Sequence, residues 1–340
     1  LTQIATNFMR QTDLNRATQA VEEQIRRLPQ TLPLFGPNAI VADPAANQEL
    51  DAYLQFYHLP RPNNQLTLLA GRLEQDDLRS HLMLWKPDQA QSTAVIVHGY
   101  LDHTGLYRHL IKHLLNQNIA VLSFDLIGHG LSSGRPASIK CFDQYVAQLD
   151  QVLTAARPLC PNPLHGIGQS TGGAVLLKQL FDQGKCPDYP FASLNLLAPL
   201  VQPKLWALNK WLFKLTRPFR KTMKRVFRAN SQDDEFLDFI RHSDPFQPHR
   251  LPADWVGAMA DWVEEIGRSE ENHFPINVIQ GDSDGTLDWQ HNIKLLQSKF
   301  PNMSLQLVEG AGHHLVNESE SLRQTIFAAL VFPGQSSRPD

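Results

Sequence analysis

Apolar and polar residues follow one another along the chain in blocks that predict strands and helices in alternation. Short apolar runs, typical of buried strands, occur at residues 94–97, 119–124, 163–167, 194–197, 276–279 and 303–308. Apolar residues repeat at helical spacing at 107–115, 139–153, 173–180, 289–300 and 319–331. Because strands that alternate with helices pair in parallel, we predict an α/β fold with a mostly parallel, doubly wound sheet.

Three parts of the chain depart from this alternation. The N-terminal part is polar and then proline-rich, with one amphipathic helical pattern at 14–28. Residues 66–73 and 81–85 predict two strands joined by a turn at 74–77. Between 202 and 272 no strand pattern is present, which predicts a helical cap inserted over the sheet. The expected division is an N-terminal extension (1–62), an α/β core (63–201 and 273–340) and a cap (202–272).

One serine lies in a context suited to nucleophilic attack. The sequence Gly168-Gln169-Ser170-Thr171-Gly172 follows one predicted strand and precedes an apolar helical segment. Small residues two before and two after the serine allow a tight turn that lifts its hydroxyl above the sheet. The five-residue pattern alone is weak evidence, so the flanking strand and helix give it weight. Ser170 is therefore the candidate nucleophile, and the backbone amide of Thr171 a candidate oxyanion donor.

A serine nucleophile needs a base and a carboxylate that orients the base. Asp284 follows the predicted strand 276–279, and His313 follows the predicted strand 303–308. Since ligands on a parallel sheet bind beyond the carboxyl ends of the strands, we expect both side chains to approach the serine. The order serine, aspartate, histidine is that of an α/β-hydrolase triad.

Each of these loops offers alternatives. For the carboxylate, Asp284 is favoured over Asp282 and Asp288. For the base, His313 is favoured over His314, and because adjacent residues point differently, only one of the two can face the serine.

A second oxyanion donor is expected from the loop 98–103, which follows the strand 94–97. The amide of Tyr100 is the favoured donor, and Gly99 permits a close approach. His98 is expected to brace this loop rather than to act as a base or metal ligand.

These segments together resemble the serine hydrolases of the monoacylglycerol lipase and lysophospholipase group, within the α/β-hydrolase superfamily. The resemblance spans roughly 66–201 and 273–332, and it rests on 98–103, 125–132, the Ser170 turn, Asp284 and 310–313. One departure is Tyr100-Leu101-Asp102, where these lipases usually have small residues and a glutamate.

The resemblance implies specific roles for residues of this chain. It implies a catalytic triad of Ser170, Asp284 and His313, oxyanion donors at Tyr100 and Thr171, and structural roles for Asp125 and His129. The implied activity is hydrolysis, through an acyl-enzyme, of monoacyl lipids (monoacylglycerol or lysophospholipid) or of short- and medium-chain carboxylic esters. The alternatives are acyl transfer to another acceptor, an aminopeptidase-like amidase, and a non-catalytic lipid-binding module.

The cap contains an unusual basic segment. Lys204–Arg228 has nine lysines and arginines and no acidic residue, and its apolar residues repeat every three or four positions. Pro218 predicts two helices rather than one. Two interpretations stand: the apolar stripe packs over the active site, or the segment docks on an anionic lipid surface.

Composition narrows the function classes. Hydrophobic residues make up 42% and charged residues 19% of the 340 residues, as in ordinary globular proteins. The net charge of −3 gives no reason to expect nucleic-acid binding. No apolar run approaches the roughly 20 residues of a membrane span. Three cysteines without metal-ligand spacing predict free thiols and a cytoplasmic location. Without metal, phosphate-loop or dinucleotide motifs, we expect no cofactor.

Overall fold

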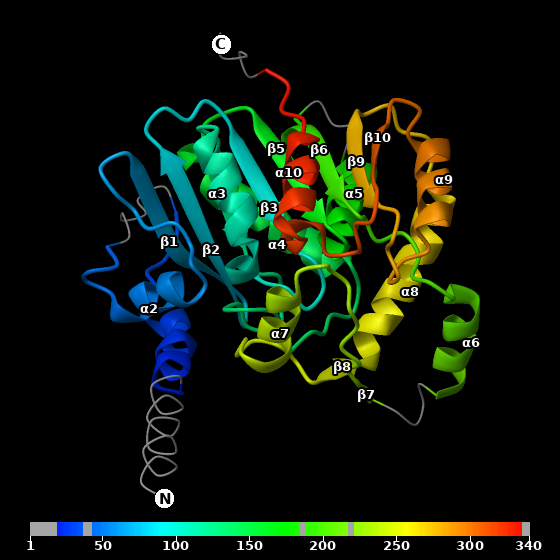
Figure 1. Ribbon diagram of the computed structural model, residues 1–340, viewed down its shortest axis with the longest axis horizontal. Coiled ribbons are helices and arrows are strands. Elements are labelled where there is room, and N and C mark those ends of the chain that lie inside the picture. Colours follow the sequence, from blue (N-terminus) through cyan, green and yellow to red (C-terminus); the bar gives the residue numbers. More distant parts are fainter. Residues whose placement is uncertain (1–18, 37–42, 184–187, 217–220, 335–340) are drawn as a thin grey trace, which may run out of the picture.

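The core is an eight-stranded sheet with the order β1-β2-β4-β3-β5-β6-β9-β10 (Figure 1). A computed structural model describes residues 19–36, 43–183, 188–216 and 221–334. The strands are β1 (Leu66–Gln75), β2 (Leu78–Pro87), β3 (Thr93–Val97), β4 (Ala120–Phe124), β5 (Leu164–Gln169), β6 (Phe191–Leu197), β9 (Ile276–Gly281) and β10 (Ser304–Val308). Strand β2 is antiparallel to β1 and β4, and the six strands from β4 to β10 are parallel, as the alternation predicts.

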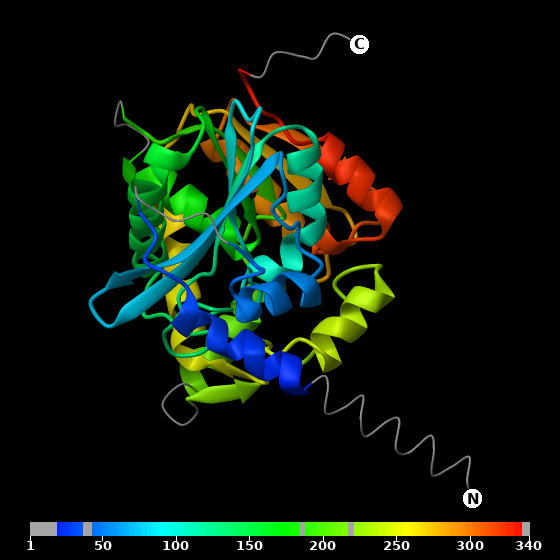
Figure 2. The same cartoon turned by 90° about the vertical axis from the view of Figure 1, so that its left-hand side faces the viewer.

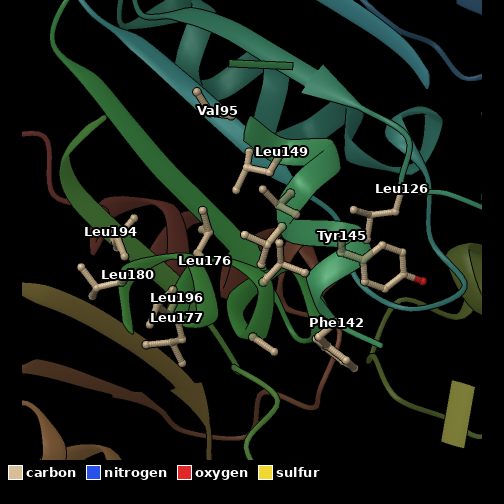
Figure 3. Packing of buried hydrophobic residues seen from close by; sticks show 14 of the residues in the cluster. Val95, Leu126, Phe142, Tyr145, Leu149, Leu176, Leu177, Leu180, Leu194 and Leu196 are labelled. Carbon is tan, nitrogen blue, oxygen red and sulfur yellow. The ribbon is translucent and has the colours of Figure 1, made fainter. Parts of the chain in front are cut away.

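Helices cover both faces of the sheet. One face carries α3 (Arg108–Asn116) and α10 (Glu320–Ala328), and the other carries α4 (Asp143–Ala156), α5 (Thr171–Gln183) and α9 (Trp289–Lys299). Figure 3 shows the packing on the second face, with Tyr145 and Leu149 of α4, Leu176 and Leu180 of α5, and Val95 of β3. All five side chains are buried. Each contributes about 1.5–3 kcal/mol through removal from water, which makes α5 and β5 a rigid base for the turn between them.

Helix and strand ends differ in places from the predicted bounds. The hairpin turn is shorter than 74–77, because β1 and β2 pair as far as Gln75 and Leu78. Helix α4 begins at Asp143 rather than at 139, since Gln144 accepts a hydrogen bond from the Lys140 amide in the preceding loop.

Helix α10 also ends earlier than the predicted 331, at Ala328. After Ala328, side-chain amides from the sheet bond the backbone groups that a longer helix would pair internally. Asn195 bonds both the N–H and the C=O of Val331, and Asn277 donates to the Ala329 carbonyl.

The N-terminal extension lies against the β1–β2 end of the sheet (Figures 1 and 2). Residues 19–31 are helical, and α2 spans Gln48–Phe56. The helix at 19–31 is the described part of the pattern predicted at 14–28, and it buries Ile25 and Leu28 completely. Arg26 donates to the Pro245 carbonyl, which joins the extension to the chain segment between β6 and β9.

The segment between β6 and β9 is not purely helical, so that part of the prediction is wrong. It contains α6 (Trp206–Thr216), α7 (Asp234–His242) and α8 (Ala253–Arg268). It also contains an antiparallel ribbon of β7 (Thr222–Lys224) and β8 (Arg250–Pro252), so a strand lies where Pro218 suggested a second helix. Pro218 itself lies outside the described residues. No helix in the described parts of the chain is long and apolar enough to cross a membrane.

Candidate active site

Ser170 lies at a sharp turn between β5 and α5. Its φ of +51° is a left-handed conformation that side chains rarely adopt. A methyl group at Gly172 would lie 1.9 Å from the Val97 carbonyl oxygen, and one at Gly168 would lie 2.5 Å from a backbone nitrogen of α5. The Ser170 amide donates to the Leu197 carbonyl of β6 at 2.8 Å. The turn therefore needs both glycines, and the neighbouring strand holds it in place.

Three predicted side chains meet in one line of hydrogen bonds. The Ser170 hydroxyl lies 3.0 Å from His313 Nε2, and His313 Nδ1 lies 2.8 Å from Asp284 Oδ2. The other oxygen of Asp284 accepts the amides of Thr286 and Leu287 at 2.7 and 3.0 Å. These bonds make Nδ1 the protonated nitrogen, so Nε2 is free to accept the serine proton.

The electrostatics of this line suit a base. Burial disfavours the charged forms of Asp284 and His313, but their mutual attraction and hydrogen bond outweigh it. The pKa of Asp284 is lowered to about 2, so this carboxylate stays ionised near neutral pH. The pKa of His313 is raised above its ordinary value of 6.5.

The alternative residues lie elsewhere. Asp282 accepts the Gly310 amide at 2.7 Å and joins two loops. Asp288 precedes the first residue of α9, and its carboxylate accepts a hydrogen bond from the Gln202 side-chain Nε2 at 3.4 Å. His314 points to Asp102, with 3.0 Å between Nε2 and Oδ1.

Buried side-chain hydrogen bonds fix the loop 98–103, which supplies the predicted oxyanion donor Tyr100. Asp102 also accepts the Tyr107 hydroxyl at 2.9 Å, and this hydroxyl in turn accepts the Gly99 amide at 3.0 Å. Leu101, which lies between Gly99 and Asp102 in the sequence, has a φ of +69°, a strained conformation for a branched side chain. Sequence reasoning missed the contact of Asp102 with His314, and its only trace is the pair of adjacent histidines.

Two backbone amides near the candidate nucleophile have no hydrogen-bond partner among the described residues. The amides of Tyr100 and Thr171 make no hydrogen bond to any described residue, and both residues line the same cavity as Ser170. Thr171 is also the first residue of α5, where the helix dipole favours negative charge. This arrangement is suited to binding an oxyanion.

The polar residues of the neighbouring loop brace the site. His98 Nε2 accepts the Leu126 amide at 2.8 Å, and burial lowers the pKa of its imidazole. Asp125 accepts the amides of Thr104 and Leu131, both at 2.7 Å. Burial lowers the pKa of His129 to about 3, so this ring stays neutral. These residues hold loops together, in agreement with the structural roles expected for them.

A second buried network joins this loop to the cap and the N-terminal extension. Asp244 lies 3.0 Å from His103 Nε2 and accepts the Tyr57 hydroxyl at 2.8 Å. Gln247 donates to Asp244 at 2.7 Å and to the Leu101 carbonyl at 3.1 Å. No sequence motif indicated it, because its members are far apart in the chain: Tyr57 and Asp244 alone are separated by 187 residues.

A cavity of about 280 Å³ lies above the serine. The apolar part of its wall includes Leu200, Leu251, Trp255, Met259 and Leu287. The ring of Tyr100 stacks on Trp255 with 3.5 Å between centroids. No group of three potential metal ligands lies together among the described residues. Cys141 and Cys160 are free thiols, and Cys186 lies outside the described residues.

The parallel sheet, the helices on both faces and the turn at Ser170 define an α/β hydrolase. The chain belongs to the family described as serine aminopeptidase S33, whose model matches residues 88–320. Human monoglyceride lipase is 29% identical over 254 residues, which cover 72% of this chain and 82% of that protein. Phospholipase YtpA of Bacillus subtilis is 29% identical over 261 residues, covering 74% and 98%. A monoglyceride lipase structure from Saccharomyces cerevisiae superposes with a TM-score of 0.66 at 17% identity, covering 79% and 96%.

Proposed function

We propose that the protein hydrolyses carboxylic esters of monoacyl lipids with Ser170 as nucleophile. The observation that carries this proposal is the continuous line of hydrogen bonds from Ser170 through His313 to Asp284. His313 takes the hydroxyl proton as the serine oxygen attacks the ester carbonyl, and Asp284 stabilises the imidazolium that forms. The amides of Tyr100 and Thr171 bind the oxyanion.

The second half of the reaction uses the same groups. His313 returns the proton to the leaving alcohol as the ester C–O bond breaks, which leaves the acyl group on Ser170. Water then attacks the acyl-enzyme with His313 again as base, and the fatty acid departs.

The cavity favours a single acyl chain as substrate. Its wall is largely aliphatic and aromatic, and the relatives named above are called monoglyceride lipase and phospholipase. An aminopeptidase substrate would bring an ammonium group instead. The side chains of Arg225 and Arg228 line the cavity and would repel it, and the nearby Asp102 is already bonded to His314 and Tyr107. Ester hydrolysis therefore fits the site better than amide hydrolysis.

The cap, taken as residues 202–272, is also proposed as a lipid contact. Helix α6 and the residue before it leave large apolar side chains exposed, namely Leu205 (66%), Leu208 (55%), Trp211 (62%) and Leu215 (58%). These side chains are exposed to solvent. They therefore do not fit the interpretation in which the apolar stripe of this segment packs over the active site. Exposed apolar residues beside lysines favour contact with an anionic lipid surface. We also propose a cytoplasmic location, which the free thiols of Cys141 and Cys160 support.

The catalytic proposal is tested with a panel of esters of increasing chain length, a monoacylglycerol and an aminoacyl amide. Ser170→Ala should abolish ester turnover and labelling by a fluorophosphonate. Ser298→Ala, an exposed serine on α9, is the matched control and should retain both. Normal turnover by Ser170→Ala would overturn the proposal, and amide turnover in place of ester turnover would show a peptidase.

The lipid contact is tested by sedimentation with vesicles that contain an anionic phospholipid. Trp211→Ser should reduce binding, whereas Leu307→Ser, which removes an exposed leucine of β10, should not. Equal binding by both variants would contradict the proposed contact.

A further inference from the structure

The cavity wall holds a half-buried arginine that has no carboxylate partner. The Arg225 guanidinium donates from Nη1 to the Gln247 side-chain oxygen and lies 4.2 Å from the centroid of the Phe227 ring. Its remaining N–H groups have no hydrogen-bond partner among the described residues. The side chain is half-buried, and the partial loss of water around its charge lowers the pKa of this group.

Two other shielded cations among the described residues are paired with carboxylates. Lys178 lies 2.6 Å from Glu265, and Arg323 lies 3.2 Å from Asp233. The carboxylates of Asp102 and Asp244 attract Arg225 through space, but other donors fill them. These donors are His314 and Tyr107 for Asp102, and Tyr57, His103 and Gln247 for Asp244. A partly desolvated guanidinium with open donors is therefore available to a ligand.

We propose that Arg225, with Arg228 beside it in the cavity wall, binds an anionic group of the ester substrate. The ligand chemistry is a phosphate or a carboxylate, because the planar fork of a guanidinium pairs with two oxygens of either group. This inference rests on the proposed ester hydrolysis and specifies the class of ester.

The location of Arg225 indicates which part of the substrate carries the charge. Gln247 bonds both Arg225 and the Leu101 carbonyl, and Leu101 follows the proposed oxyanion donor Tyr100. The arginine therefore lies near the reacting carbonyl, and the anionic group belongs on the alcohol side, a few bonds from the ester. The group keeps its charge during the reaction: the acyl C–O bond breaks, the alcohol takes the proton from His313, and the anion leaves with the alcohol.

The test compares three esters with one acyl chain, each used below its critical micelle concentration. They are a neutral monoacylglycerol, a lysophosphatidic acid and an acyl ester of glyceric acid. The measured quantity is the ratio of kcat/KM for an anionic ester to kcat/KM for the neutral one. Arg225→Gln should lower this ratio about 10- to 100-fold, the usual effect of losing a charge-assisted hydrogen bond. Arg225→Lys, which keeps the charge without the fork, should lower it less.

The matched control is Arg241→Gln, which removes an exposed cation from α7 of the same cap and should leave the ratio unchanged. An unchanged ratio in Arg225→Gln overturns the inference, even if all rates fall together, because Arg225 then only positions the oxyanion loop. The two anionic esters show whether phosphate or carboxylate is recognised.

A measurement on the unmodified protein guards against variants that fail to fold. Dodecyl phosphate should inhibit neutral-ester hydrolysis at lower concentration than dodecanol, and equal inhibition by the two overturns the inference. If the unmodified protein hydrolyses no ester, the proposed function fails. If it hydrolyses the neutral ester but shows no Arg225-dependent preference, only the inference fails.

Discussion

Replacing Asp102 tests how the oxyanion loop is held. Its carboxylate accepts His314 at 3.0 Å and Tyr107 at 2.9 Å, and all three side chains are buried or nearly so. Asp102→Ala leaves both donors without an acceptor. Each unpaired buried donor costs about 1–3 kcal/mol, so for two donors we expect a loss of about 2–6 kcal/mol in the free energy of unfolding.

The same substitution should impair catalysis. Leu101 holds its φ of +69° only while its surroundings fix the loop, and such strain amounts to about 1–3 kcal/mol. Without the Asp102 carboxylate the loop can relax and move the Tyr100 amide away from the oxyanion. Loss of one such donor lowers kcat by about 10²–10³-fold, whereas KM should change little, because this donor acts on the transition state.

The assays are urea unfolding and ester hydrolysis as a function of pH. Asp102→Asn keeps the shape and one acceptor, so it should retain most of the stability. It removes a negative charge that raises the pKa of His313, so the acid limb of kcat/KM should move to lower pH. A purely structural role would not produce that shift.

Asp254→Ala, which breaks an exposed ion pair with Arg135, serves as the control and should change unfolding by less than about 1 kcal/mol. If Asp102→Ala kept kcat within about 3-fold of the parent and unfolded like this control, the reasoning would be refuted.

Three further expectations follow from the site. Activity requires neutral His313, and pairing with Asp284 raises the pKa of this histidine. The value of kcat/KM should therefore fall as the pH drops through an apparent pKa above 6.5. An apparent pKa below 6.5 would contradict the pairing with Asp284. Asp284→Asn should lower kcat about 10⁴-fold in single-turnover assays and move the His313 limb to lower pH. Gly172→Ala should sharply lower the melting temperature, because its methyl group meets the Val97 oxygen at 1.9 Å, whereas Gly267→Ala on α8 has open space and should not.

Much of the parallel sheet was predictable because strands such as β3, β4 and β9 are short, mostly apolar runs buried on both faces. Ser170, Asp284 and His313 could be proposed from sequence for a related reason: each follows the end of a parallel strand, and these ends lie along one edge of the sheet. The two glycines of the turn are required by close backbone contacts, which gives the five-residue pattern its meaning.

The remaining features depend on contacts between distant parts of the chain. The ribbon of β7 and β8 consists of three-residue strands, too short for any periodic pattern, and 25 residues separate them. His314 and Asp102 are 212 residues apart and form a pair that neither local sequence indicates. In the sequence Arg225 is one of nine basic residues in the segment 204–228, and nothing distinguishes it from the others. Only the fold shows that it lines the cavity.

The N-terminal extension has a consequence for self-association. Strand β1 is the edge strand of the sheet, and its Arg72 exchanges backbone hydrogen bonds with Pro33 and Phe35, both at 2.8 Å. An unpaired edge strand offers open N–H and C=O groups to a second chain, which is a common route to aggregation. A protein shortened to begin at residue 63 would expose this edge and also leave the buried Asp244 without the Tyr57 hydroxyl. The extension therefore covers part of the β1 edge, and a protein trimmed to residues 63–340 should be more prone to associate through this edge.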